Sequence, residues 1–255
     1  MNTIILIPSK NRSFQLECET GQWLFNAGFP YKIIVEPQNL EEYSKKFGAD
    51  NMLPLKENDK GMEYAQFHGK QFALENGYDF IFKIDDDIHG WATIFKGDTK
   101  NNTERFQLLM QEIQKPMEHP SCAGISFGYR QEFWHDKQWL GVNQRFQTCY
   151  VVRTNLYRPL EQGYSMGMWE DMINFLRVIE DGHKVLRYGR YLMDTEVESG
   201  MPGGLTDYYK KRTPEQYASV IENLRKEFPW LPFRQKDDGR IEPDFNNPVV
   251  AGKKL

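Results

Sequence analysis

Cysteine is scarce in this sequence. Three cysteines, Cys18, Cys122 and Cys149, stand among 255 residues, and no two of them form a C-x-x-C pair. An odd number of widely spaced cysteines argues against a disulfide framework and against a cysteine zinc site. We therefore expect reduced thiols.

Long apolar runs and an excess of one charge are lacking too. The apolar run at residues 4–7 is stopped by Pro8 and is too short for a signal-peptide core or a membrane span. We expect a cytoplasmic protein, in the host cytoplasm if it is viral, with no membrane anchor of its own. With 32 basic and 36 acidic residues the net charge is -4, which excludes a uniformly basic, nucleic-acid-coating protein.

The first half of the chain has the pattern of an α/β protein. Hydrophobic residues make up 40% of the chain, enough for a sizeable core. Short β-branched runs alternate with amphipathic stretches of helical length, which is typical of a mostly parallel central sheet flanked by helices. We expect strands at 3–7, 31–35, 52–55 and 79–84, and helices at 13–27, 40–47 and 61–75.

The second half is less regular. It predicts strands at 122–129, 147–153 and 184–193, and helices at 103–118, 170–180 and 214–228. A glycine-rich joint at 200–204 precedes the last helix. The tail from Pro229 is expected to be an extended wrap or partly disordered.

Three adjacent aspartates, Asp85, Asp86 and Asp87, follow the fourth strand. Ligands bind at this edge of an open α/β sheet. Adjacent carboxylates repel one another and resist desolvation unless a cation compensates them. In an extended backbone Asp85 and Asp87 would project to one side and Asp86 to the other. Mg²⁺ and Mn²⁺ favour such oxygens and bridge substrate phosphates; the alternative is a solvated loop start.

This triplet, with Pro8, Ser9 and Arg12 after the first strand, resembles the D-x-D motif and opening loop of GT-A glycosyltransferases. The order of elements over residues 3–200 is similar to that family as well. The resemblance implies a GT-A (Rossmann-like) fold, a nucleotide-sugar donor, UDP-sugar first, and Mn²⁺ or Mg²⁺. It implies a catalytic domain at 1–200, with a nucleotide-binding half at 1–90 and an acceptor half with a smaller mixed sheet at 91–200. Residues 201–255 would form a lid, helix and tail packed on the same domain.

The resemblance also assigns the donor site. Carried over position by position, the donor-binding residues are Pro8, Ser9, Arg12, Glu36, Lys60, Gly61, Asp85, Asp86, Gly203 and Gly204, and the metal ligands are Asp85 and Asp87. Arg12 and Lys60 as solvated surface charges, and Gly203-Gly204 as an ordinary loop, are the alternatives. The family often supplies a further histidine ligand, but no histidine follows His183. Asp194, Glu196 or water would have to replace it.

Trp169-Glu170-Asp171 opens a helix after a glycine-rich turn and is similar to the E-D motif of inverting GT-A enzymes. There a carboxylate removes the proton of the acceptor hydroxyl. The resemblance assigns this role to Asp171 first and to Glu170 second, and implies inversion. Acidic residues also favour helix N-termini for electrostatic reasons alone, which is the alternative explanation.

The acceptor side is expected in residues 127–158, where aromatic and basic side chains interleave. Such a mixture suits a sugar platform or a nucleic-acid surface, and we expect half of the eight aromatics to lie in the core. The candidates for acceptor contact are Arg130, Trp134, Trp139 and Trp169.

The compact build, the opening loop, the triplet and the late glycine pair together resemble the TET-associated glycosyltransferases of bacteriophages. That resemblance implies 5-hydroxymethylcytosine in DNA as acceptor, reached by extrusion of the base. A saccharide, lipopolysaccharide or protein acceptor remains an alternative. A nucleotidyltransferase would carry a glycine-rich basic loop after the first strand, which is missing here, and an inactive nucleic-acid-binding module would show no turnover.

Overall fold

The computed structural model describes residues 1–131, 140–142, 145–162, 169–195, 213–237, 239–244, 247 and 250. Its strands are β1 (Thr3–Pro8), β2 (Tyr31–Val35), β3 (Met52–Pro54), β4 (Phe80–Lys83), β5 (Ile88–Thr93), β6 (Cys122–Tyr129), β7 (Leu140–Val142), β8 (Tyr150–Arg153), β9 (Lys184–Thr195), β10 (Phe233–Gln235) and β11 (Ile241–Pro243). Its α-helices are α1 (Ser13–Cys18), α2 (Thr20–Leu24), α3 (Leu40–Phe47), α4 (Met62–Glu75), α5 (Asn102–Glu118), α6 (Glu170–Glu180) and α8 (Pro214–Glu227), with short 3₁₀ turns at Pro37–Asn39 and Ala49–Asn51.

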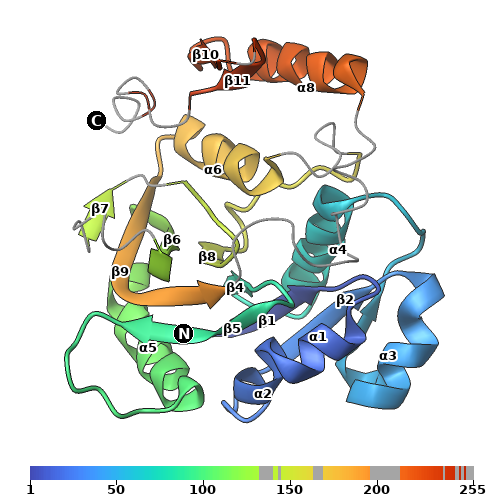
Figure 1. Cartoon of the computed structure of the whole chain (residues 1–255), viewed down its shortest axis with the longest axis vertical. Helices are drawn as coiled ribbons and strands as arrows, with labels where there is room; N and C mark the ends of the chain where they lie inside the picture. The colour runs from blue at the N-terminus through green and yellow to red at the C-terminus, as the bar shows by residue number, and fades with distance from the viewer. Residues whose placement is uncertain are drawn as a thin grey trace.

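The described residues form one mixed sheet of nine strands (Figure 1), in the order β3-β2-β1-β4-β8-β6-β9-β5, with β7 beside β9. The four strands from β3 to β4 are mutually parallel, as predicted. From β8 onward the pairing is mostly antiparallel. β4 lies where the two patterns meet, so the residues that follow it lie at the centre of the sheet edge.

Helices cover both faces of this sheet, and each face has its own core. Ile5 and Ile7 of β1 pack in the core that also contains residues of α1, α2, α3 and α5. The alternate residues, Ile4 and Leu6, pack in the second core, with residues of α4, α6 and α8. Burial on both faces explains why β1 is continuously apolar rather than alternating.

The structure confirms the α/β class and most predicted elements, but it corrects four details. The helix predicted at 13–27 is broken at Glu19 (φ -118°, ψ -96°) into α1 and α2. Gly21 allows the tight junction, because a Cβ there would lie 2.6 Å from the carbonyl oxygen of Leu16. The tail, expected to be extended, contains the antiparallel pair β10–β11. The mixed part is continuous with the parallel part and is no separate sheet.

The fourth correction is β5, which the sequence did not predict because Gly90 interrupts its apolar pattern. The glycine is needed for a close approach: a Cβ would lie 2.1 Å from the amide of Asn102. That amide accepts a hydrogen bond from the Trp91 N–H (3.1 Å) and donates to the His89 carbonyl (3.1 Å). The strand is therefore stabilised by the first turn of α5.

The C-terminal helix packs on the body through a buried ion-pair group. Arg177 of α6 contacts Glu63 of α4 and lies 2.7 Å from Glu227 of α8. Within the described ranges, no helix has the length and apolarity needed to cross a bilayer.

Candidate donor and catalytic site

The acidic triplet forms a turn between β4 and β5, and Thr20 holds both ends of it. The Thr20 hydroxyl donates to the Asp85 carbonyl (2.9 Å) and accepts from the Ile88 N–H (2.9 Å). Trp23 adds an indole hydrogen bond to the Ile88 carbonyl (3.0 Å). Since Thr20 directly follows the break at Glu19, the broken helix is what brings its hydroxyl to the turn.

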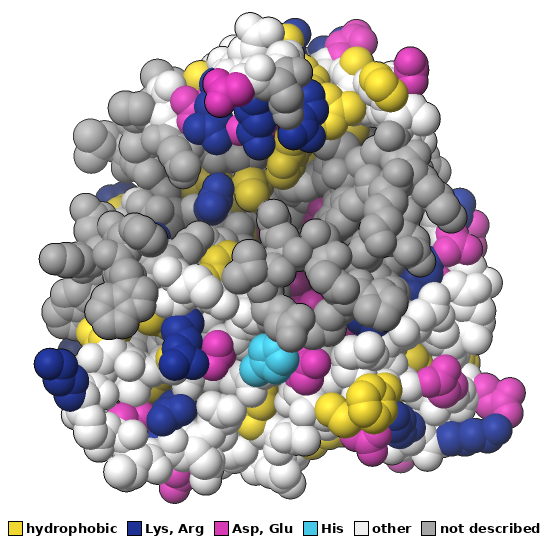
Figure 2. All heavy atoms as spheres, in the orientation of Figure 1, with side chains coloured by type: hydrophobic (Ala, Val, Ile, Leu, Met, Phe, Trp, Pro, Cys, Tyr) yellow, Lys and Arg dark blue, Asp and Glu magenta, His cyan; other side chains and the backbone are white. Residues whose placement is uncertain are grey.

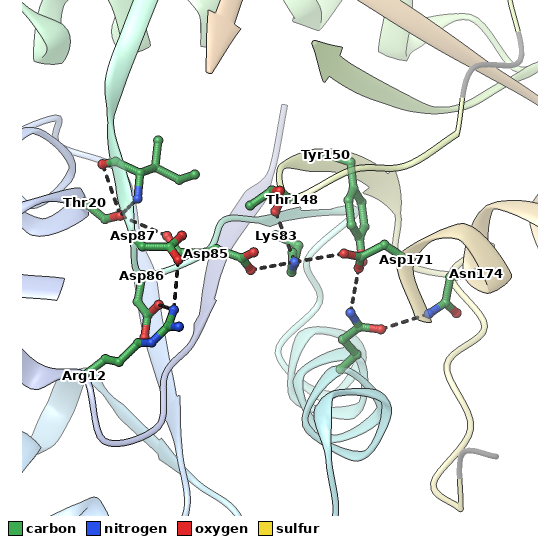
Figure 3. Close-up of polar contacts among 12 residues, drawn as sticks. Arg12, Thr20, Lys83, Asp85, Asp86, Asp87, Thr148, Tyr150, Asp171 and Asn174 are labelled. Carbon is green, nitrogen blue, oxygen red and sulfur yellow. Dashed lines mark hydrogen bonds and ion pairs between the residues drawn. The ribbon is translucent and has the colours of Figure 1, made fainter. Parts of the chain in front are cut away.

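The side chains of the triplet do not alternate as in a strand. Asp86 and Asp87 both contact Arg12, whose Nη1 lies 3.3 Å from Asp86 Oδ1 and 2.8 Å from Asp87 Oδ2. Asp85 turns the other way, toward Lys83 (Figure 3). The predicted alternation was wrong because β4 ends at Lys83, before the triplet begins.

The loop after β1 supplies the partners of Asp86. The Ser9 hydroxyl donates to Asp86 Oδ2 (2.5 Å) and lies 2.7 Å from the Tyr43 hydroxyl, which also accepts from the Arg12 N–H (2.9 Å). Burial raises the pKa of Asp86 to about 7, and the charge of Asp87 adds to this rise, while Arg12 and Ser9 oppose it. Burial also raises the pKa of Asp87, helped by Asp85.

Glu36 and the loop before α4 lie on the same side. Glu36, directly after β2, accepts from Lys10 (3.0 Å), from the Gln38 amide (2.6 Å) and from the Asp59 N–H (2.9 Å). Pro8 ends β1 and pairs with Ile34 of β2, two residues before Glu36. Gly61 caps α4 with φ 88°, a conformation that favours glycine. The structure thus brings the predicted loop residues Ser9, Arg12 and Glu36 to one sheet edge.

Lys60 lies directly before Gly61, the N-cap of α4. It is an exposed side chain paired with Glu57 at 2.9 Å. Lys10 is the lysine that contacts Glu36, and sequence reasoning did not single it out.

A buried lysine links the triplet to α6. Lys83 Nζ lies 2.6 Å from Asp85 Oδ1 and 3.2 Å from Asp171 Oδ2, and it donates to the Thr148 carbonyl (3.1 Å). Burial acts to lower the pKa of Lys83, but Asp171 and Asp85 outweigh it and raise that pKa well above its ordinary value. Sequence reasoning missed this residue, although a lysine inside an apolar strand was a usable signal.

Asp171 is held by donors from three other elements (Figure 3). Its Oδ1 accepts from the Gln66 amide of α4 (2.8 Å) and from the Tyr150 hydroxyl of β8 (3.0 Å). Its Oδ2 accepts from the Lys83 amine of β4 (3.2 Å). The Asn174 amide fixes Gln66 in turn (2.9 Å). Burial raises the pKa of Asp171, opposed by Lys83. Its carboxylate is therefore oriented and less acidic than usual, as a general base requires.

Glu170 has a different environment, although it is the neighbouring residue. Burial raises its pKa to about 8, and the charge of Asp171 adds to the rise. At neutral pH Glu170 is thus mostly protonated, which leaves Asp171 as the better base of the two.

The acceptor candidates are only partly described. Arg130 forms an exposed ion pair with Asp194 (2.7 Å), and the ring of Trp169 packs on Tyr217 with centroids 5.6 Å apart. Trp134, Trp139, Gly203, Gly204 and Glu196 lie outside the described residues. Of the eight aromatics between 127 and 158, five are described, and four of those five are buried: Phe127, Phe146, Tyr150 and Tyr157.

The carboxyl groups of the acidic turn have the oxygen-ligand chemistry that a divalent cation requires. No group of three or more histidine, cysteine or acidic side chains among the described residues is arranged to hold a metal alone. In this part of the chain, however, five carboxyl groups (Asp85, Asp86, Asp87, Glu170 and Asp171) gather around two cations, Lys83 and Arg12. Burial raises the pKa of Asp86, Asp87, Glu170 and Asp171, and a neighbouring carboxylate adds to the rise in each case. Acidic side chains are also visible in the recessed middle of the face in Figure 2.

Comparison with known proteins identifies the family. A family model described as TET-associated glycosyltransferase matches residues 3–204. No curated protein matches the chain. The chain is similar to the solved structure of a putative nucleotide-diphospho-sugar transferase from Desulfovibrio desulfuricans G20, at 13% identity and a TM-score of 0.48, over 87% of this chain and 95% of that one.

Two further solved structures are similar at the same low identity. For S. aureus TarS 1-349 the identity is 12% and the TM-score 0.43, over 90% of this chain and 72% of that one. For UDP-glucose pyrophosphorylase complexed with UDP-glucose the identity is 13% and the TM-score 0.47, over 83% of this chain and 100% of that one. The family match spans the acidic turn and α6, and on that match the chain belongs to the TET-associated glycosyltransferase family and is a glycosyltransferase with an α/β fold.

Proposed function

We propose that this glycosyltransferase is metal-dependent, is of the GT-A type, and moves a sugar from a UDP-sugar to 5-hydroxymethylcytosine in DNA, with inversion. One observation carries the proposal. The loop after β1 and the acidic turn meet at the centre of the sheet edge, and Asp171 is held next to them through Lys83.

The donor side of the proposal uses the residues around the acidic turn. Ser9, Arg12 and Glu36 would bind the nucleotide with the N-terminus of α4 at Gly61, which is favourable for anions. Asp85 and Asp87 would hold Mn²⁺ or Mg²⁺ through carboxylate oxygens, the ligand type that these ions favour. The ion, when bound, offsets negative charge on the leaving diphosphate.

The acceptor side of the proposal uses Asp171 as general base. The acceptor oxygen forms a bond to the anomeric carbon while the bond from that carbon to the diphosphate breaks. Asp171 takes the hydroxyl proton, and the diphosphate leaves with the electron pair. The donors Tyr150 and Gln66 hold the Asp171 carboxylate in place for this transfer.

The family name and the exposed Arg130 support a DNA acceptor. We propose that Trp134, Trp139 and Trp169 line that side, and that Gly203 and Gly204, in the segment 201–255, belong to a lid that closes over the diphosphate of the donor. The contacts of α8 with α6 support a single domain with a catalytic part at 1–200.

A transfer assay tests the function. Labelled UDP-sugars with Mn²⁺ are incubated with hydroxymethylated DNA, with unmodified DNA of the same sequence, and with a glycan panel. We expect label only on the hydroxymethylated DNA, an inverted anomeric configuration by NMR of the product, and loss of transfer in Asp171→Asn. Label on glycans alone would replace the DNA acceptor by a saccharide, and retention would remove the role of Asp171.

A further inference from the structure

Lys83 is a charged side chain in the middle of the sheet. Its residue is 2% exposed, and its strand, β4, lies between β1 and β8. The amine contacts Asp85 on the donor side, Asp171 on the acceptor side and the backbone carbonyl of Thr148. Figure 3 shows the two carboxylates on opposite sides of the same nitrogen.

Burying an ammonium group is costly, and the cost is offset only by well-placed opposite charges. Lys83 has two such partners, which come from the turn after β4 and from the first turn of α6. One cation thus fixes the positions of the two carboxylates that the proposed reaction uses on its two substrates.

This arrangement creates competition at Asp85. A divalent ion bound to this carboxylate would share it with an ammonium group that already lies 2.6 Å away. Two cations on one carboxylate repel each other, strongly so where water is excluded. The presence of Lys83 must therefore weaken metal binding while it orients Asp171.

We propose that Lys83 is a positioning residue that links the donor and acceptor sites, holding Asp171 toward the acceptor at the expense of metal affinity at Asp85. The proposal rests on the proposed function. It predicts opposite effects on two measured quantities, whereas a purely structural lysine would weaken both.

The test compares Lys83→Met, which removes the charge at similar length, with Lys83→Arg, which keeps it. The affinity for Mn²⁺ in the presence of UDP is measured by EPR of the free ion, and kcat is measured separately. We expect Lys83→Met to bind Mn²⁺ roughly tenfold more tightly, because a neighbouring positive charge is gone. Its kcat should fall by about tenfold or more, because Asp171 loses its orientation. Lys83→Arg should have near wild-type Mn²⁺ affinity.

A second pair of variants covers the case in which Lys83→Met does not fold. Asp171→Asn leaves the ammonium with Asp85 alone and should bind Mn²⁺ more weakly than the wild type. The double variant Lys83→Met/Asp171→Asn removes one charge of each sign and should bind more tightly than Asp171→Asn.

Equal or weaker Mn²⁺ affinity in the folded charge-removing variants would overturn the role of Lys83 while leaving the proposed function intact. If the wild type itself bound no Mn²⁺ with UDP, the proposed function would fail first, and this inference with it.

Discussion

Arg12 Nη1 lies 2.8 Å from Asp87 Oδ2 and 3.3 Å from Asp86 Oδ1, so one guanidinium group compensates two neighbouring acids. The side chains of Arg12, Asp86 and Asp87 are all largely buried. Without Arg12 the acidic turn would have to keep its charges apart or take up protons.

We therefore predict that Arg12→Met destabilises the metal-free protein at pH 8 by about 3 kcal/mol, in the range for breaking a buried pair. Mn²⁺ should restore more stability to this variant than it adds to the wild type, because the ion compensates the same carboxylates. Thermal unfolding with and without Mn²⁺ measures both effects. Lys32→Met, at a lysine outside the turn, is the control, and equal Mn²⁺ effects in all three proteins would refute the prediction.

Glu170 provides a pH-dependent prediction. Its folded-state pKa of about 8 lies above its ordinary value of 4.5, so between these limits the folded state binds more protons than the unfolded state. The stability contributed at this site is present at low pH and is lost as the pH rises through 8. Glu170→Gln has no titrating carboxyl group at this site, so it does not lose stability there as the pH rises.

The stability of Glu170→Gln relative to the wild type should thus grow between pH 5.5 and pH 9. One pKa unit corresponds to about 1.4 kcal/mol, and we expect a gain of about 2 kcal/mol. Urea unfolding at the two pH values measures it. Glu75→Gln, at an exposed glutamate, should show no such trend, and a pH-independent difference for Glu170→Gln would contradict the assigned environment.

Thr20 and Thr103 form a matched pair for testing the acidic turn. The Thr20 hydroxyl joins the two ends of the turn, while the Thr103 hydroxyl donates to the Trp23 carbonyl (2.8 Å) outside it. Each Thr→Val substitution should cost about 1–2 kcal/mol for lost hydrogen bonds. Only Thr20→Val should also weaken UDP binding in calorimetry. If both variants bound UDP like the wild type, the turn would not depend on Thr20.

Substitutions at Tyr150 and Tyr157 test whether a hydroxyl orients the Asp171 carboxylate or only contributes to packing. The two hydroxyls lie 2.7 Å apart, and the Tyr150 hydroxyl donates to Asp171 (3.0 Å). A hydrogen bond to a charged group contributes about 1.5–3 kcal/mol, so Tyr150→Phe should lower kcat by roughly tenfold or more. Its KM for the donor should stay unchanged. Tyr157→Phe should retain most of kcat, and a larger loss in Tyr157→Phe than in Tyr150→Phe would count against this role.

Local sequence signals predicted much of the fold. The helix at 40–47 and the strand at 122–129 have their predicted limits, because an amphipathic run ending at Gly48 and a continuous apolar run are decided within a few residues. The position of the acidic triplet at the end of a central strand followed in the same way. The alternation of strands and helices also predicted the parallel pairing of β1, β2, β3 and β4.

The contacts within the site were less predictable, since they depend on elements distant in sequence. Lys83 contacts Asp171, 88 residues later in the chain. This contact depends on the pairing of β8 with β4, because α6 follows β8 in the chain. Arg12 meets Asp87 across 75 residues. The break at Glu19 was not predicted either, because the residues around it are compatible with a continuous helix. The hydrogen bond of Thr20 that favours the break is made to Asp85, which lies in another segment of the chain.

The central claim is that Asp85 and Asp87 hold a divalent ion that binds a nucleotide diphosphate, and the most direct measurement is thermal stability with UDP and Mn²⁺, alone and together. A ligand at 100 times its Kd adds about 2.7 kcal/mol of stability. The account predicts that UDP with Mn²⁺ stabilises the wild type and Asp50→Ala by more than either ligand alone, and that Asp87→Ala loses most of this gain. An equal gain in Asp87→Ala, or a gain from UDP that Mn²⁺ leaves unchanged, would contradict it.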